Sequence, residues 1–160
     1  MFSEKFENKK LKFHFDTVKS EDLRQINAID DREEEHAEML ELQDKGEGKF
    51  FVARDGNEIA GYVFVYYEHE SAHFPDKKTP FLEDLMVGQK FRKKGLGKQL
   101  LEMCETEIKD KGEQELYFAV LADNDNAINF YKKNGYHRIP EMDFETPGKE
   151  IGYYFRKDLE

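Results

Sequence analysis

Tryptophan is absent from this 160-residue sequence, proline occurs four times, and cysteine occurs once, at Cys104. A single cysteine excludes an internal disulfide and a metal site built from several thiolates. Cys104 falls on the apolar side of a predicted helix, so we interpret it as a small buried hydrophobic residue rather than a nucleophile. The five histidines show no spacing typical of metal ligands, and the sequence therefore predicts no metal site.

Long apolar runs and an excess of positive charge are also missing. No apolar run approaches the roughly 18 residues that a membrane-spanning helix requires, and the first residues do not form a basic and then apolar signal. We therefore expect a cytoplasmic protein with no membrane partner. The formal net charge of −10 disfavours binding to nucleic acid, whose phosphates need a positive surface, and favours cationic partners.

The residues that are present are sufficient for one folded domain. Hydrophobic residues make up 38% of the sequence, and 14 Phe and 8 Tyr supply large apolar side chains. A chain of 160 residues commonly forms one domain with its own core. We therefore predict a single domain over residues 1–160, with one active site.

Hydrophobic patterns divide the sequence into strands and helices. Alternating apolar and polar residues predict strands, whereas apolar residues recurring every four positions predict a long helix that ends at Gly112. Because strands come first and then alternate with helices, we expect an α/β fold with helices on both faces of a mixed sheet. Strands are expected at residues 11–18, 49–54, 59–67, 81–87, 115–121 and 151–156, helices from Ser20, at 30–47, at 95–111 and from Asn124 to Asn134, a hairpin turn at 55–57, and a polar loop at 68–79.

The junction between the fourth strand and the longest helix has the features of an anion site. Gly95 and Gly97 remove side chains where a ligand could approach the backbone, and the amides of the first helical turn point outward. Cations gather at this positive end of the helix dipole, where they are normally disfavoured. The segment therefore predicts a bound polyanion, although a solvated basic turn is the alternative. The cations are Lys90, Arg92, Lys93, Lys94 and Lys98.

Two common nucleotide-binding motifs do not fit this junction. A Walker loop requires glycine and a hydroxyl residue where Arg92 and Gln99 stand, and the dinucleotide fingerprint requires glycine where Leu100 stands. The pattern that remains is Arg-x-x-Gly-x-Gly, from Arg92 to Gly97.

With this motif the sequence resembles the GNAT superfamily of N-acetyltransferases, most strongly from Phe81 to Tyr136. Three blocks, at residues 82–87, 92–97 and 124–136, follow the order and spacing of that family. The resemblance implies a GNAT-like α/β (α+β) fold, with a mixed, mostly antiparallel sheet of six to seven strands that is splayed between strands four and five. The triplet at residues 82–84 is similar to that of the spermidine and diamine acetyltransferases.

The resemblance also implies acetyl-CoA as cosubstrate and assigns residues to it. The backbone at residues 92–98 would hold the pyrophosphate, and the strand that ends at Val87 would pair with the pantetheine arm. Lys93 and Gln89 depart from the glycine and proline of many members, but neither removes an amide that the site needs. The cofactor-binding residues implied are Leu85, Met86, Val87, Arg92, Lys93, Lys94, Gly95, Leu96, Gly97, Lys98, Asn124, Asn126 and Tyr131.

Three residues are implied in catalysis. Taking the proton from an alkyl ammonium group at neutral pH costs roughly 4.6 kcal/mol, so a base is required. Consecutive strand residues face opposite sides, so one of Glu83 and Asp84 should face the site. The resemblance of the triplet to that of the spermidine and diamine acetyltransferases implies Glu83, acting directly or through water. The resemblance implies that the Leu85 amide stabilises the oxyanion and that Tyr131 donates to the departing thiolate, whereas periodicity alone would make Tyr131 a core residue.

The acceptor is predicted from charge. The acid-rich run at residues 30–44 falls where the family builds one wall of the acceptor pocket, so we expect a cationic primary amine: a polyamine or diamine, a lysine-like side chain, or a protein amino terminus. A solvated helix face is the alternative explanation for this run. A non-catalytic acyl-CoA-binding module and a polyanion-binding interaction protein are the alternative functions, and a homodimer is expected from the frequency of dimers among related proteins.

Overall fold

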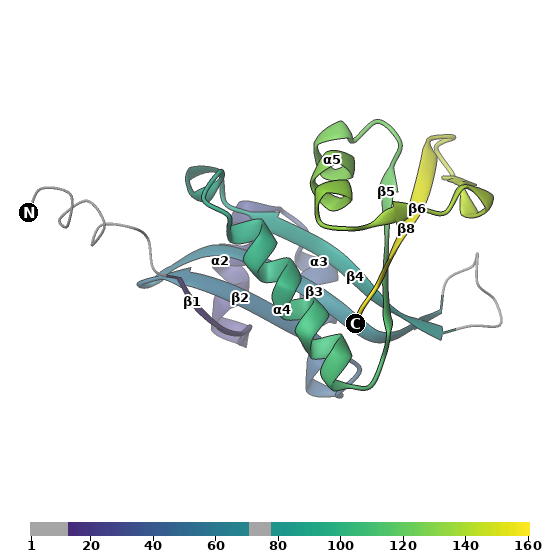
Figure 1. Ribbon diagram of the computed structural model, residues 1–160. Coiled ribbons are helices and arrows are strands. Elements are labelled where there is room, and N and C mark those ends of the chain that lie inside the picture. The colour runs from purple at the N-terminus through teal and green to yellow at the C-terminus, as the bar shows by residue number, and fades with distance from the viewer. Residues whose placement is uncertain (1–12, 71–77) are drawn as a thin grey trace, which may run out of the picture.

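The computed structural model describes residues 13–70 and 78–160, which form one open, mostly antiparallel sheet with helices on both faces (Figure 1). The strand order is β1-β2-β3-β4-β5-β8-β6, and β7 pairs with β8. The strands are β1 His14–Thr17, β2 Gly48–Asp55, β3 Glu58–Glu70, β4 Lys78–Val87, β5 Glu115–Leu121, β6 His137–Arg138, β7 Phe144–Glu145 and β8 Ile151–Asp158. The helices are α2 Leu23–Ile29, α3 Glu33–Asp44, α4 Leu96–Asp110 and α5 Asp125–Lys133, with short 3-10 turns η1 Ser20–Asp22, η2 Gln89–Phe91 and η3 Pro140–Met142.

Two apolar cores lie on opposite faces of the sheet, because neighbouring residues of a strand point to opposite sides. Val63 packs with the buried face of α4, which includes Leu100 and Cys104, whereas Phe64 packs on the other face with residues of α2 and α3. Cys104 is fully buried, as the periodicity of its helix predicted. The sheet is thus covered on both sides, by α4 on one face and by α2 and α3 on the other.

The sheet is divided at β4 and β5. These strands run parallel and share a single register pair, Phe81 with Tyr117, after which they diverge. Every other pairing in the described sheet is antiparallel. The predicted splay between the fourth and fifth strands is therefore confirmed, and it exposes the backbone of β4 beside the start of α4.

Two details of the sheet differ from the sequence predictions. The sheet has eight strands rather than six to seven, because β6 and β7 contain two residues each and are too short to show a period. The polar loop expected at residues 68–79 is partly strand, since β3 extends to Glu70 and β4 begins at Lys78. Residues 11–12 of the first predicted strand and 71–77 of that loop lie outside the described residues.

The helix of the acid-rich run is less exposed than its sequence suggested. It begins with three glutamates, which the helix dipole favours, but it buries His36 and Met39 against the sheet. Its two buried side chains are too few to give a strong apolar period among so many acids. Among the described helices, none is long and apolar enough to cross a lipid bilayer.

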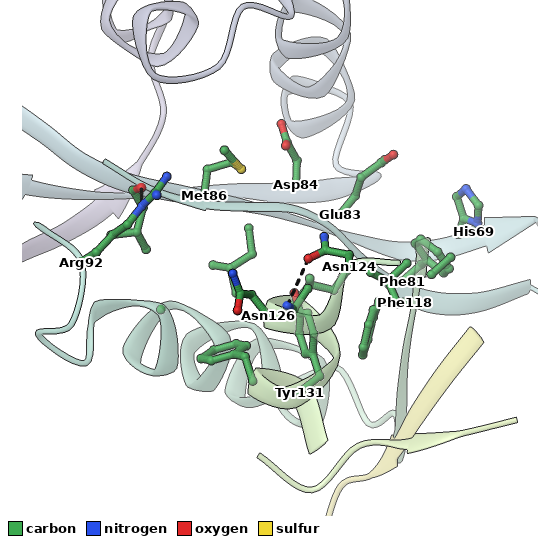
Figure 2. A pocket seen from close by; sticks show the side chains of 18 residues that line it. His69, Phe81, Glu83, Asp84, Met86, Arg92, Phe118, Asn124, Asn126 and Tyr131 are labelled. Carbon is green, nitrogen blue, oxygen red and sulfur yellow. Dashed lines mark hydrogen bonds between the residues drawn. The ribbon is translucent and has the colours of Figure 1, made fainter. Parts of the chain in front are cut away.

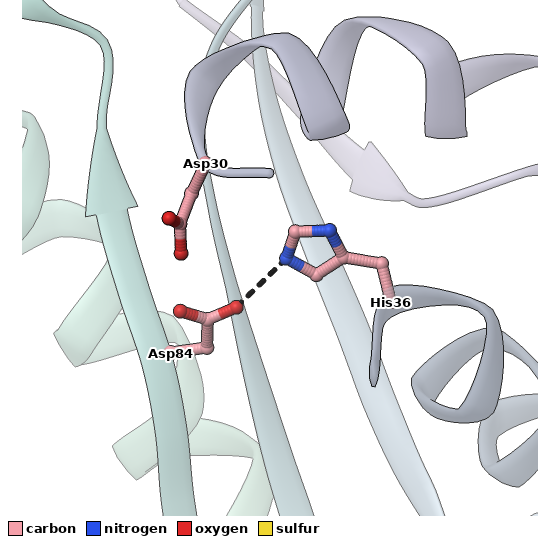
Figure 3. Close-up of side chains that lie close together, drawn as sticks. All are labelled: Asp30, His36 and Asp84. Atoms are coloured by element: carbon pink, nitrogen blue, oxygen red, sulfur yellow. Dashed lines mark hydrogen bonds and ion pairs between the residues drawn. The ribbon is translucent and has the colours of Figure 1, made fainter. Parts of the chain in front are cut away.

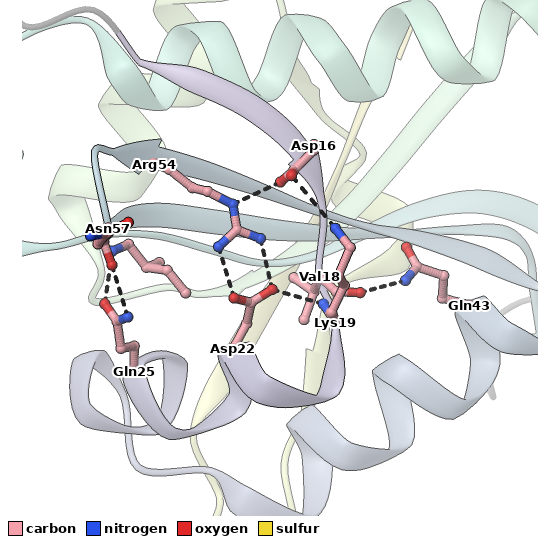
Figure 4. A network of polar contacts seen from close by, with 9 residues as sticks. Asp16, Val18, Lys19, Asp22, Gln25, Gln43, Arg54 and Asn57 are labelled. Atoms are coloured by element: carbon pink, nitrogen blue, oxygen red, sulfur yellow. Dashed lines mark hydrogen bonds and ion pairs between the residues drawn. The ribbon is translucent and has the colours of Figure 1, made fainter.

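A polar network fastens α2 and α3 to the first strands (Figure 4). The Arg54 guanidinium donates to both carboxylate oxygens of Asp22, at 2.8 and 2.7 Å, and to Asp16 at 3.0 Å. Gln43 donates to the Val18 carbonyl and accepts from a β2 amide. These contacts fix the position of the two helices against the sheet.

Candidate active site

A cavity of about 750 Å³ opens where β4 and β5 diverge (Figure 2). It is lined by β4, the start of α4, the end of β5 and α5. Nine of the predicted site residues line it: Glu83, Leu85, Met86, Val87, Arg92, Gly97, Asn124, Asn126 and Tyr131. Five others lie in the turn and first helical turn beside it, with side chains that do not line the cavity: Lys93, Lys94, Gly95, Leu96 and Lys98.

The turn that opens α4 has the backbone of an anion site. Lys93 and Gly95 both adopt left-handed conformations, with φ of 63° and 79°, a region that favours glycine. The Arg92 amide donates to the Gln89 carbonyl, and the next backbone bond of this turn runs from the Gln99 amide to the Gly95 carbonyl, so the amides of residues 93–98 between them are available to a ligand. Arg92 donates to the Val87 carbonyl at 3.2 Å, which joins this turn to the end of β4.

A bulge in β4 shapes the opposite wall. In the register of β3 with β4, Tyr62 lies opposite Met86 and Phe64 lies opposite Glu83. Val63 of β3 therefore faces two residues of β4, Asp84 and Leu85, which is a β-bulge. Asp84 adopts φ 59° within this bulge. Figure 2 shows the carboxylates of Glu83 and Asp84 on the same side of β4, away from Tyr131. The expectation that only one of them could face the site was therefore wrong, because the bulge interrupts the alternation.

The two carboxylates have different partners. Glu83 is half-buried near Tyr66, whose pKa is raised first by burial and then by the charge of Glu83. Asp84 Oδ1 accepts from Arg32 at 3.0 Å, and its Oδ2 lies 2.9 Å from His36 Nε2. The Asp84 side chain is 4% exposed. Glu83 is thus the carboxylate with access to an incoming amine.

His36 was not singled out by the sequence, because a lone histidine in an acid-rich helix shows no motif. Its Nε2 and oxygens of Asp30 and Asp84 all lie within 4.8 Å of one another (Figure 3). These atom types can bind a divalent cation. Arg32, however, already pairs with the same Asp84 carboxylate and supplies positive charge there. The absence of a metal site stays a prediction.

Tyr131 lies between the cavity and the core. Its ring packs against Phe118 at a centroid distance of 3.7 Å, and the residue is 7% exposed. Burial, followed by the nearby Cys104 and Asp84, raises the pKa of its phenol, which therefore keeps its proton and can donate a hydrogen bond. Transfer of that proton to a thiolate is more uphill than it is for an ordinary phenol.

The start of α5 presents two asparagines to the same cavity. Asn124 caps the helix, since its side-chain oxygen accepts from the Ala127 amide at 3.2 Å. Asn126 lines the cavity in the first turn, near Tyr131 (Figure 2). Their polar groups lie at the edge of the gap between β4 and β5.

His69 is a second histidine that the sequence gave no reason to select. Its ring stacks on Phe81, with centroids 4.5 Å apart, and burial lowers its pKa against the opposing effect of the Glu83 charge. His69 lines the main cavity and a neighbouring one of about 590 Å³ between α3 and the end of β3. The charged residues that line the neighbouring cavity are Glu38, Glu47, Glu68, Glu70 and Lys78.

The model of the acetyltransferase (GNAT) family matches residues 19–136. The chain is 31% identical over 104 residues to an uncharacterised N-acetyltransferase in the pepI 3′ region of Lactobacillus delbrueckii subsp. lactis, covering 65% of this chain and 60% of that protein. It is 30% identical over 103 residues to L-ornithine N5-acetyltransferase NATA1 of Arabidopsis thaliana, covering 64% of this chain and 44% of that protein.

The chain thus matches less than two thirds of the length of these relatives. Among solved structures, it is similar in fold to the PaiA N-acetyltransferase of Thermoplasma acidophilum, which was solved in complex with coenzyme A. The TM-score is 0.67 at 19% identity, with 92% of this chain and 99% of that chain covered.

Proposed function

Because the chain belongs to the GNAT family of acetyltransferases, we propose that it is an enzyme that transfers an acetyl group from acetyl-CoA to a cationic primary amine. Transfer occurs by direct attack while both substrates are bound. The observation that carries the proposal is the cavity itself, in which a helix-opening turn, a bulged acidic strand and a buried phenol meet.

The cofactor is proposed to lie in the gap between β4 and β5. Within the segment at residues 92–98, the pyrophosphate would accept hydrogen bonds from the amides of residues 93–98, and the surrounding cations, Arg92 among them, would offset its charge. The pantetheine arm would follow β4 past Leu85 and Val87, with Asn124 and Asn126 on its other side. The single register pair between β4 and β5 supports this placement, because it leaves room for an extended chain beside β4.

The chemistry is divided between the two sides of β4. Glu83 takes a proton from the ammonium group, and the free amine attacks the thioester carbon. The Leu85 amide stabilises the oxygen of the tetrahedral intermediate, and the C–S bond then breaks. Tyr131 donates a hydrogen bond to the leaving sulfur, and the second proton that the nitrogen loses as the amide forms neutralises this thiolate, while Glu83 releases the first proton to solvent.

The acceptor is proposed to be cationic because of the cavity that meets the main one at His69. Four glutamates and one lysine line that second cavity, so it attracts positive charge. A diamine or polyamine, a lysine-like side chain or a protein amino terminus would supply such charge. The similarity to a protein named for the N5 amine of L-ornithine supports the same class. A cytoplasmic location and a homodimer remain proposals from the sequence.

Acetylation assays across acceptor classes test this function. The protein is incubated with acetyl-CoA and, separately, spermidine, small diamines, amino acids, aminoglycosides and peptides, and release of coenzyme A is measured. We expect the highest kcat/KM with acceptors that carry a second positive group. Transfer confined to neutral or anionic acceptors would contradict the cationic class. Tight acetyl-CoA binding without transfer to any acceptor would favour a non-catalytic binding module.

A further inference from the structure

Asp84 has a backbone conformation that the surrounding structure must hold. A left-handed φ of 59° is unfavourable for residues other than glycine, although aspartate tolerates it better than most. Such conformations persist at functional sites when neighbouring groups fix them. At Asp84 the conformation creates the bulge, so whatever holds the side chain also sets the directions of Glu83 and Leu85.

The Asp84 carboxylate is held at both oxygens by the segment that begins α3. Arg32, the residue before the helix, lies 3.0 Å from Oδ1, and His36, one turn later, lies 2.9 Å from Oδ2. The Arg32 side chain also pairs with Glu35. The wall of the acceptor side is thus joined directly to the residue on which the bulge depends.

The imidazole of His36 is held in place by burial, by Asn27 and by two aromatic rings. His36 is 0% exposed, its Nδ1 lies 2.6 Å from Asn27 Oδ1 in α2, and its ring lies 5.2 Å from Tyr62 and 6.3 Å from Phe50. A proton on Nε2 is donated to Asp84 Oδ2, and the role of Nδ1 toward Asn27 follows from the tautomer of the ring. Because His36 has no exposed surface, it acts through Asp84 and does not touch the substrate.

We infer that His36, supported by Asn27, is a positioning residue that, together with Arg32, clamps Asp84 in its left-handed conformation and thereby aims the Glu83 carboxylate and the Leu85 amide at the thioester. The inference rests on the proposed function for its catalytic consequence, whereas the effect on the bulge does not depend on it. The groups that face the imidazole are Asn27 of α2, Asp30 and Arg32 between the helices, Asp84 of β4 and Tyr62 of β3.

Substitutions at position 84 separate backbone positioning from chemistry by the carboxylate. Asp84→Gly removes the clamp but allows a left-handed conformation, whereas Asp84→Ala removes the clamp and disfavours that conformation. We expect Asp84→Gly to retain a kcat about tenfold or more above that of Asp84→Ala, which corresponds to about 1.4 kcal/mol. Equal loss of activity in both would overturn the inference, because the carboxylate would then act itself.

Substitutions at position 36 test the clamp from the other side. We expect His36→Ala to lower kcat at least about tenfold with little change in the KM for acetyl-CoA, and His36→Gln, which keeps a donor, to recover much of the loss. The pH profile of the remaining activity should keep its shape, since the imidazole transfers no proton. A profile that loses one of its limbs in His36→Ala would overturn the positioning role.

A structural readout separates this inference from the proposed function. Amide exchange at Leu85 should accelerate in His36→Ala and Asp84→Ala, but not in Tyr62→Phe, whose hydroxyl has no hydrogen-bond partner among the described residues. This result is expected even if the wild-type protein acetylates none of the amines tested. Unchanged Leu85 exchange in His36→Ala would overturn the clamp. Loss of wild-type activity in EDTA with recovery in Zn²⁺ would also overturn it, in favour of a metal at Asp30, His36 and Asp84.

Discussion

At the scale of single residues, hydrogen-bond partners distinguish two adjacent carboxylates that look alike in the sequence. Both oxygens of Asp84 have partners in α3 or just before it, whereas Glu83 lines the cavity beside Tyr66 and His69. A base needs a free lone pair within reach of the amine. The partners of Asp84 therefore favour Glu83 as the base in the proposed mechanism. The sequence could not show this, because those partners are distant from Asp84 along the chain.

Replacing Glu83 with glutamine should lower kcat by about 10² to 10⁴ and leave acetyl-CoA binding unchanged. The deficit should shrink as the pH rises towards about 10, since more of the amine then carries no proton to remove. Steady-state kinetics with spermidine between pH 6 and 10, together with calorimetry of acetyl-CoA binding, would measure both effects. Glu141→Gln, at an exposed position, is the matched control. A Glu83→Gln enzyme with wild-type kcat would refute the role of this carboxylate.

Replacing Tyr131 with phenylalanine removes the proposed donor and leaves the ring that packs on Phe118. We expect kcat to fall by about 10² to 10³, as when a preorganised donor is lost, with the melting temperature nearly unchanged. Because burial raises the pKa of Tyr131, its donor should stay protonated above the ordinary phenol range, so no alkaline loss of activity should arise from this residue. Tyr153→Phe serves as the control, and equal activity of the two variants would contradict the assignment.

At the scale of elements, the sequence predicted what depends on long periodic patterns. The strands at residues 49–54, 81–87 and 115–121 and the helix at 95–111 all correspond to elements of the structure. The missed features depend on few residues: β6 and β7 are two residues long, and the β4 bulge rests on one φ angle. The His36 contact with Asp84 joins residues 48 positions apart, which no local pattern reveals.

Three glycine variants test the turn that opens α4. Gly95→Ala and Gly46→Ala both place alanine at a positive φ with open space around it, so each should lower the free energy of unfolding by about 1–2 kcal/mol. Only Gly95→Ala should also weaken coenzyme A binding. Gly97→Ala should weaken binding with little loss of stability, because its Cβ would enter the cavity 3.4 Å from Phe130. Denaturant unfolding and calorimetry would measure the two quantities.

If Gly46→Ala weakened coenzyme A binding as strongly as Gly97→Ala, the effect would come from general destabilisation. The proposed anion site would then lose its support. Equal affinities for free pyrophosphate and coenzyme A would instead favour a polyanion-binding protein, since the gap beside β4 would contribute nothing.

At the scale of the whole molecule, buried tyrosines limit the pH range of the fold. Burial is the main cause that raises the pKa of Tyr62, Tyr131 and Tyr136. A pKa raised in the folded state contributes stability below the unfolded value near 10 and loses it as the pH rises beyond that value. At low pH, the hydrogen bond from Arg54 lowers the pKa of Asp22 in the folded state. The stability that this ion pair contributes is present above the unfolded pKa of Asp22 and is lost as the pH falls through its folded pKa.

We therefore expect cooperative alkaline unfolding within about two pH units above 10. Each of the three tyrosines costs about 1.4 kcal/mol per pH unit there, against a typical total stability of about 5–15 kcal/mol. Circular dichroism should lose its folded signal as phenolate absorbance rises. Absorbance that reports all eight tyrosines ionised while the folded signal persists would contradict this expectation.

The divergence of β4 and β5 also separates two continuous stretches of chain. Residues 13–70 and 78–110 contribute β1 to β4 and three of the four α-helices that the structure describes, residues 115–160 contribute the rest, and the two sets of strands share one register pair. A ligand bound between β4 and β5 would contact both parts of the chain and would stabilise their packing against each other. At a concentration of acetyl-CoA 100 times its Kd, the bound acetyl-CoA would add about 2.7 kcal/mol to the free energy of unfolding, so the temperature at which the enzyme unfolds would rise with the concentration of acetyl-CoA.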